Sequence, residues 1–267
     1  MSKILITGGT GLIGSYLTKK LEKGGHEVAI LSRTPQGKNQ YKWDISTSFI
    51  DPNALKNTDY IIHLAGAGIA DKRWTSTRKK ILIDSRVASA NLLFNKVKEF
   101  RIPIKGFISA SGIGYYGART IPQVFHEDDA PSNDFISQIC IAWEDAAHQF
   151  RSLDIPVIIL RTGVVLSDEG GALNRINTPL VLAPLGSGKQ FMPWIHLEDL
   201  SNLYVNAVQF NYMDGIYNAV GPEHQSNRSF TKTLGKATNK PVLPFSIPSI
   251  LLKIPFENQI YLYLMLV

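Results

Sequence analysis

The sequence KILITGGTGLIG, residues 3–14, joins a short apolar run to a glycine-rich turn. The apolar run predicts a strand buried on both faces, and the residues after the turn, with Leu17 and Leu21 on one side and a Gly-Gly stop at 24–25, predict an amphipathic helix. In such a unit Gly8 permits the tight turn, Gly11 lets a pyrophosphate approach the backbone, and Gly14 allows close helix packing. The unit predicts a dinucleotide site more strongly than a merely structural turn.

A second predicted strand, residues 27–31, is followed by Ser32 and Arg33. Sites for NAD usually place an acidic residue near this position, where it holds the ribose 2′-hydroxyl. A guanidinium offers a planar fork to a 2′-phosphate, whereas a carboxylate would repel it. The sequence therefore favours NADP(H), with Thr34 and Lys38 as further donors, and a solvated loop arginine is the alternative.

The alternation of strand and helix patterns continues well beyond these two strands. We expect strands near 41–45, 59–64, 106–109 and 157–161, and helices near 75–100 and 134–153. Asp44 and Ile45 would lie beside the adenine, and small residues such as Ala65 and Gly66 fit the crevice where open α/β sheets bind ligands. A helix near 197–209 and a strand near 216–219 follow a region rich in Pro and Gly.

The predicted fold class is α/β, a doubly wound parallel sheet of the Rossmann-like type with a smaller C-terminal substrate lobe. Residues 1–165 would form the NADP-binding domain, and residues 166–267 would form the lobe, interleaved with the sheet. The chain has 267 residues, is 44% hydrophobic and carries 28 Lys+Arg against 22 Asp+Glu, a net charge of +6. This composition can bury a sizeable core and excludes a disordered tail or a coiled-coil rod.

Several classes of partner and location are disfavoured by the sequence. The longest apolar run, residues 260–267, is too short to span a membrane, and the N-terminus lacks a secretory apolar segment, so we expect a cytoplasmic protein. The single Cys140 and the scattered histidines make a metal site improbable. No basic stripe with interleaved aromatics predicts nucleic-acid binding.

Further motifs resemble the extended short-chain dehydrogenase/reductase superfamily, also called NAD-dependent epimerase/dehydratases. Beside the glycine loop, these motifs are His63-Leu-Ala-Gly66, Ile108-Ser-Ala-Ser111, Tyr115-Tyr116-Gly117, Leu160-Arg-Thr-Gly163 and Trp194-Ile-His-Leu-Glu-Asp199. A narrower branch of largely uncharacterised epimerase family proteins, thought to bind NADP(H), is similar at Arg73-Trp74, Ser85-Arg86, Trp143-Glu144, Gly170-Gly171 and Gly186-Ser-Gly-Lys-Gln190. The resemblance implies cofactor contacts from Gly8, Thr10, Gly11, Leu12, Ile13, Gly14, Ser32, Arg33, Leu64, Ala65, Arg86 and the backbone near Val164.

The superfamily's chemistry normally depends on a tyrosine and a lysine four residues later, and these positions fall on Ile136 and Cys140. Neither can transfer a proton as that pair does, so we expect both to be packing residues; the narrower branch shares the loss. Ser111 and Tyr116, on the loop expected to face the nicotinamide, could polarise a carbonyl or could be satisfied loop residues. Among nearby cations, Arg73 is the better candidate for the site, and Arg78 to Lys80 are expected on a solvated helix face.

The sequence is compatible with two classes of function. The first is an NADP(H)-dependent oxidoreductase or epimerase acting on a small carbonyl or sugar-like molecule, anionic substrates included. The second is a non-catalytic NADP(H)-binding module whose bound conformation a partner recognises. A homo-oligomer is compatible with either class.

The last residues depart from the resemblance. Relatives in the narrower branch continue beyond the segment 245–252 with a helical stretch and a closing Gly-Phe segment, whereas this chain reads ENQIYLYLMLV over 257–267. We expect a truncated or frame-shifted C-terminus that leaves an apolar surface prone to association. The alternative is that this tail docks in place of the missing segment.

Overall fold

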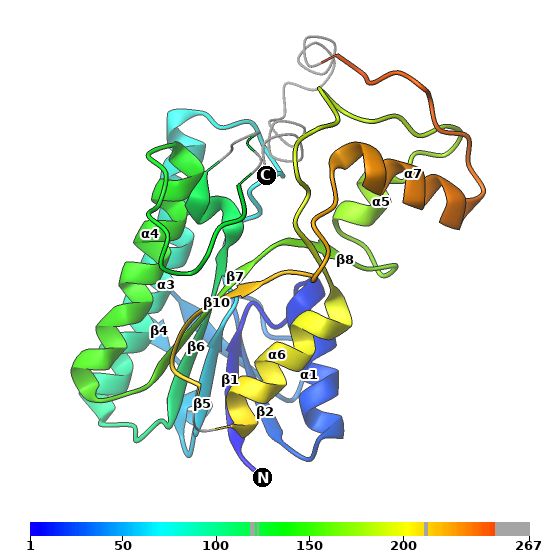
Figure 1. Cartoon of the computed structure of the whole chain (residues 1–267). Coiled ribbons are helices and arrows are strands. Elements are labelled where there is room, and N and C mark those ends of the chain that lie inside the picture. Colours follow the sequence, from blue (N-terminus) through cyan, green and yellow to red (C-terminus); the bar gives the residue numbers. More distant parts are fainter. Residues whose placement is uncertain (118–120, 122, 211–212, 249–267) are drawn as a thin grey trace.

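The computed structural model describes residues 1–117, 121, 123–210 and 213–248. Its centre is an eight-stranded sheet with the strand order β10-β7-β6-β5-β1-β2-β3-β4 (Figure 1). All neighbours are parallel except β3 and β4. The strands are β1 (Lys3–Thr7), β2 (Glu27–Ser32), β3 (Gln40–Asp44), β4 (Phe49–Ile50), β5 (Tyr60–His63), β6 (Gly106–Gly112), β7 (Val157–Thr162) and β10 (Gly215–Ala219). The predicted doubly wound sheet is confirmed.

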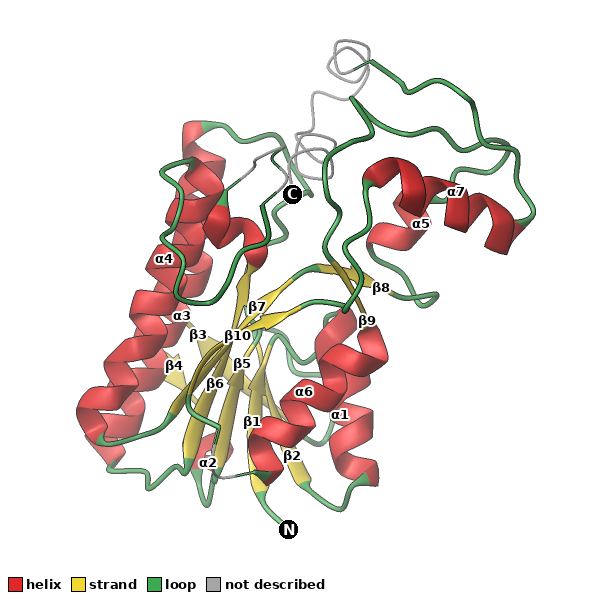
Figure 2. Ribbon diagram, viewed as in Figure 1, coloured by secondary structure: helices red, strands yellow, loops and turns green. Residues whose placement is uncertain are grey.

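Helices cover both faces of the sheet because its strands are apolar on both sides (Figure 2). One face packs against α2 (Pro52–Leu55), α3 (Ser76–Phe100), α4 (Phe135–His148) and the 3-10 turn η2 (Gln149–Leu153), around a core that includes Leu93, Phe107 and Phe150. The other face packs against α1 (Leu12–Lys23) and α6 (Leu197–Gln209). The helix expected over 134–153 therefore ends as an α-helix at His148 and continues as a 3-10 turn.

The smaller lobe has its own core and its own two-stranded parallel sheet, β8 (Val164–Leu166) with β9 (Trp194–His196). Helices α5 (Ala172–Ile176) and α7 (Asn227–Thr238) complete it, beyond the carboxyl ends of the main strands (Figure 1). Between its two segments the chain returns to the main sheet through α6 and β10. The expectation for the apolar tail at 257–267 lies outside the described residues.

Sequence patterns located the main elements and missed several small ones. Each predicted strand and helix is present, with β6 three residues longer than expected because Ala110, Ser111 and Gly112 continue the pairing with β7. The elements not predicted are β4, α2, β8, β9, α5, α7 and the 3-10 turn η1 (Ile113–Tyr116). Within the described residues, no helix is long and apolar enough to cross a membrane.

Candidate nucleotide-binding site and adjoining pocket

The glycine loop has the geometry that its sequence predicts. Gly8 has φ +71°, and a Cβ there would lie 2.9 Å from the carbonyl carbon of Leu64. A Cβ on Gly14 would lie 2.3 Å from the Gly8 carbonyl oxygen, so only glycine lets α1 start this close to β1. The Gly11 N–H donates to that same carbonyl at 3.0 Å and closes the turn.

A cleft of about 430 Å³ opens beside this loop, at the start of α1. The first turn of α1 has no side-chain cap and no acidic residue, so its backbone N–H groups and the positive end of its dipole remain available to an anion. The cleft lies where β1 pairs with β2 on one side and β5 on the other, the point at which the strand order reverses. Its described lining includes Gly8, Gly11, Leu12, Ile13, Gly14, Leu64 and Val164, seven of the predicted contacts, together with Ala70, Gly163, Val165, Gly171, Ala172 and Arg175.

A cationic corner lies at the end of β2. Arg33 is exposed, and its backbone carbonyl accepts a 2.5 Å hydrogen bond from Lys42 Nζ on the neighbouring β3. Ser32 Oγ accepts from the Thr34 N–H at 3.2 Å and fixes the turn. Lys42 therefore brings a second cationic side chain to the end of β2, where the sequence places the cofactor's ribose, and sequence reasoning missed it.

Asp44 and Ile45 lie beside this corner, at the end of β3. Asp44 Oδ1 accepts hydrogen bonds from the hydroxyl and the N–H of Ser46, at 2.6 and 2.9 Å. These bonds hold the pKa of the Asp44 carboxyl below its usual value. The structure brings both residues to the edge expected for the adenine, and their contact with the base stays a prediction. Thr10 is exposed on the glycine loop.

The loop after β5 is supported from beneath by a buried polar cluster. Thr7 Oγ1 accepts from the Ala65 N–H at 3.2 Å and lies 2.8 Å from His63 Nδ1. Burial lowers the pKa of His63 to about 4. Arg86 is also buried, donates to the carbonyls of Leu82 at 2.8 Å and Ala67 at 3.1 Å, and lies 4.8 Å from the Trp143 ring.

Arg86 therefore shapes the loop that carries Ala65 and Gly66. A Cβ on Gly66 would come 2.8 Å from the Arg86 guanidinium carbon, so a larger residue there would have to displace the guanidinium. Direct contact of Ala65, Gly66 or Arg86 with a cofactor stays a prediction.

Ile136 and Cys140, which the resemblance places at the positions of the superfamily's tyrosine and lysine, are both buried. Ile136 packs so closely on the turn after β6 that a Cβ on Gly114 would lie 2.2 Å from Ile136 Cγ2. Burial raises the pKa of the Cys140 thiol to about 12, so the thiol stays protonated at neutral pH. The structure confirms them as packing residues.

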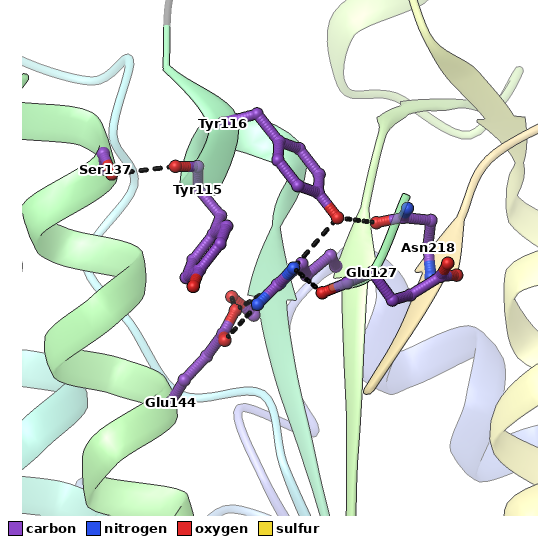
Figure 3. Close-up of polar contacts among 8 residues, drawn as sticks. Tyr115, Tyr116, Glu127, Ser137, Glu144 and Asn218 are labelled. Atoms are coloured by element: carbon purple, nitrogen blue, oxygen red, sulfur yellow. Dashed lines mark hydrogen bonds and ion pairs between the residues drawn. The ribbon is translucent and has the colours of Figure 1, made fainter. Parts of the chain in front are cut away.

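The main polar feature near Ile136 and Cys140 is a buried ion pair between Arg161 and Glu144. Arg161, at the end of β7, donates from Nε and Nη2 to the two carboxylate oxygens of Glu144 on α4, each at 2.9 Å (Figure 3). Their side chains are 1% and 5% exposed. Burial alone would lower the pKa of Arg161, but the hydrogen bonds and charge of Glu144 raise it overall. Ser111 Oγ donates to the same carboxylate at 2.7 Å.

Tyr116 extends this network toward a second pocket. Its hydroxyl accepts from Arg161 Nη1 at 2.9 Å and donates to Asn218 Oδ1 at 2.8 Å (Figure 3). Burial raises the pKa of Tyr116, and the hydrogen bond from Arg161 partly opposes this. Arg161 also lies 3.4 Å over the ring of Tyr115, so the guanidinium is held from several sides.

The second pocket, of about 150 Å³, lies between the end of the main sheet and the smaller lobe. Tyr116 and Asn218 contribute polar groups to a mainly apolar described lining that also includes Phe125, Phe191, Val220, Glu223 and His224. Ser111 does not line it, because its hydroxyl is directed to Glu144. The structure thus brings Tyr116, but not Ser111, to a cavity that could hold a substrate.

Several important residues were not predicted as site residues. Glu144 falls on the apolar face of α4, four residues after Cys140, and a carboxylate on such a face indicates a buried partner.

The expectation that Arg78 lies on a solvated face is wrong. Its side chain is 12% exposed and donates at 2.5 Å to the Gly68 carbonyl, because the loop before α3 folds back over it. Arg73 is exposed.

Comparison with known proteins identifies the family of this chain. The model of the NAD dependent epimerase/dehydratase family matches residues 4–220. The chain belongs to this family. An epimerase family protein of Mycobacterium bovis is 35% identical over 257 residues, covering 95% of this chain and 84% of the relative. The human epimerase family protein SDR39U1 is 33% identical over 264 residues, covering 96% and 87%.

Solved structures agree with this family membership. The crystal structure of human SDR39U1 isoform 2 with NADPH matches with a TM-score of 0.83 and 30% identity, covering 98% of this chain and 88% of that one. A nucleoside-diphosphate sugar epimerase from Corynebacterium glutamicum matches with a TM-score of 0.78 and 29% identity, covering 91% and 53%. Family members that bind NADPH or act on nucleotide sugars thus share this fold.

Proposed function

We propose that this family member binds NADP(H) at the glycine loop and transfers hydride to or from a small carbonyl or sugar-like substrate. The observation that carries the cofactor choice is the cationic corner at the end of β2, where Arg33 stands at the position of the usual acidic residue and Lys42 contacts its backbone carbonyl. A 2′-phosphate would gain charge-assisted hydrogen bonds there. The human relative crystallised with NADPH supports this choice.

The cleft fits such a cofactor. Glycines at 8 and 14 keep side chains out of the turn, and the uncapped start of α1 offers N–H groups to a pyrophosphate. When bound, the nicotinamide would supply or accept the hydride. The cleft and the Tyr116 pocket share a wall, because the Val164 N–H donates at 2.9 Å to the carbonyl of Pro193, which lines the pocket.

We assign proton transfer to Tyr116 rather than to Ser111. The raised pKa of Tyr116 keeps its hydroxyl protonated at neutral pH, as a proton donor to a carbonyl oxygen must be. A substrate oxygen that replaced Asn218 as acceptor would receive that hydrogen bond, with Arg161 stabilising negative charge on the phenol oxygen. The described lining of this pocket is mainly apolar and includes the carboxylate of Glu223, which favours an uncharged substrate over an anionic one.

The second candidate is a non-catalytic module in which bound NADP(H) stabilises one conformation. The observation that favours it is the burial of Ile136 and Cys140 where the superfamily carries its proton-transfer pair. In this reading Tyr116 and Arg161 are structural, and the network around Glu144 only fixes the end of the sheet.

Turnover separates the two candidates. Wild-type protein with NADPH should lose NADPH absorbance with at least one member of a panel of uncharged aldehydes and ketones. Tyr116→Phe should lower that rate about 100-fold, as for loss of a general acid, while the dissociation constant for NADPH stays within twofold. Tight NADPH binding without turnover of any compound would favour the module instead.

A further inference from the structure

We propose that Arg175 is the side chain that binds the cofactor's pyrophosphate, exchanging its present partner Asp71 for the phosphate oxygens. This inference rests on the proposed function. It gives α5, a helix of the smaller lobe, a role in holding a ligand whose other contacts come from the main sheet.

Charge in the cleft points to Arg175. Of the described residues that line the cleft, Arg175 alone carries a charge. The opposite wall offers backbone N–H groups at the start of α1 but no side-chain cation. A pyrophosphate carries two negative charges, and a guanidinium donates two parallel hydrogen bonds to such a group.

Packing brings Arg175 to the glycine loop. A Cβ on Gly171, the residue before α5, would lie 2.9 Å from Leu12 Cδ2 at the start of α1. Arg175 follows four residues later, one helical turn along α5. Gly171 also has φ +82°, so a glycine there serves both the turn and the close approach.

The contact between Arg175 and Asp71 is loose enough to exchange. Arg175 Nη2 lies 3.9 Å from Asp71 Oδ1, beyond hydrogen-bond length, and the two side chains are 50% and 54% exposed. An exposed ion pair at this separation contributes little to stability. Phosphate oxygens within hydrogen-bond distance would compete well for the guanidinium.

Asp71 also lies near a second cation. Its Oδ2 lies 4.0 Å from Nη2 of Arg78, which is anchored on the Gly68 carbonyl. Asp71 would therefore keep Arg78 as a cationic neighbour after releasing Arg175. The cofactor would then link the loop after β5, the start of α1 and α5.

Calorimetric titration with two probes tests the assignment. NADPH contains the pyrophosphate, whereas adenosine 2′-phosphate contains only the 2′-phosphate that Arg33 would bind. Arg175→Ala should weaken NADPH binding about 10-fold or more and leave adenosine 2′-phosphate binding within twofold of wild type. Arg33→Ala should weaken both, and Lys236→Ala, which removes an exposed cation elsewhere in the lobe, should weaken neither.

Two results would overturn the assignment: NADPH binding by Arg175→Ala within twofold of wild type, or equal weakening for both probes. Circular dichroism and a thermal melt verify the fold of each variant, and Arg175→Gln repeats the test with a longer side chain. If the wild-type protein binds NADPH and the Arg175→Ala variant binds it equally well, only this inference is refuted. Wild-type protein that binds neither probe refutes the proposed function as well.

A double-mutant cycle tests the exchange with Asp71. Asp71→Asn should tighten NADPH binding about two- to fivefold, the strength of an exposed ion pair, because Arg175 no longer has a competing carboxylate. In the Arg175→Ala background the same change should have no effect. Weaker binding in Asp71→Asn, or an equal effect in both backgrounds, would contradict the exchange.

Discussion

Replacing Glu144 with Gln would leave the Arg161 guanidinium buried without a counter-charge. The carboxylate now accepts three short hydrogen bonds, two from Arg161 at 2.9 Å and one from Ser111 at 2.7 Å. Removing one partner of a buried pair costs about 3 to 5 kcal/mol of the free energy of unfolding.

The structure favours the lower end of that range for Glu144→Gln. The amide oxygen can still accept one hydrogen bond from Arg161, which also keeps its bonds to the Tyr116 hydroxyl and the Glu127 carbonyl. We therefore expect a loss of about 3 kcal/mol for Gln and about 5 kcal/mol for Glu144→Leu, which keeps no acceptor.

Urea unfolding followed by circular dichroism measures this loss. Asp84→Asn is the matched control, because it breaks the ion pair between Lys80 and Asp84, whose side chains are 76% and 50% exposed. That control should stay within about 0.5 kcal/mol of wild type. The double variant Glu144→Leu/Arg161→Met should be more stable than Glu144→Leu alone. A loss below about 1 kcal/mol for Glu144→Gln would refute a buried, charge-paired Arg161.

Three further expectations concern other buried positions. The pKa of His63 is about 4 in the folded protein and 6.5 in the unfolded chain, so between these pH values the unfolded chain binds a proton that the folded protein does not. The free energy of unfolding should therefore fall by roughly 3 kcal/mol as the pH drops from 6.5 to 4. His63→Gln should remove this part of the pH dependence in urea titrations. Cys140, with its pKa near 12, should react with iodoacetamide at pH 8 only after unfolding, and rapid labelling of folded protein would contradict its burial. Gly14→Ala should weaken NADPH binding and lower the melting temperature, since its Cβ would lie 2.3 Å from the Gly8 carbonyl oxygen; a variant that matches wild type in both would show that the turn can relax.

Local patterns account for most of what the sequence could predict. The glycine loop, the buried strands and the long helix α3 each carry their signal within one segment, through apolar periodicity and turn residues. The βα alternation predicts parallel strands, and the reversal of strand order beside β1 is what the structure adds. The site at the glycine loop was predictable because its strand, turn and helix are contiguous in the sequence.

The features that sequence reasoning missed depend on contacts between distant segments. Arg175 lies about 160 positions from the glycine loop and faces it only because the smaller lobe folds over the sheet. Helix α5 is five residues long and gives no usable periodicity. Arg78 sits in a run of basic residues that is typical of a solvated face, and only the fold of the preceding loop buries it.

The relative affinity for NADPH and NADH shows whether the end of β2 selects the 2′-phosphate. Isothermal titration of wild-type protein should give tighter binding of NADPH than of NADH, because only NADPH places a phosphate beside Arg33 and Lys42. Arg33→Ala should cost about 1 to 3 kcal/mol of NADPH binding and leave NADH binding nearly unchanged. Equal affinity of the wild-type protein for the two cofactors would show that Arg33 and Lys42 do not select the phosphorylated cofactor.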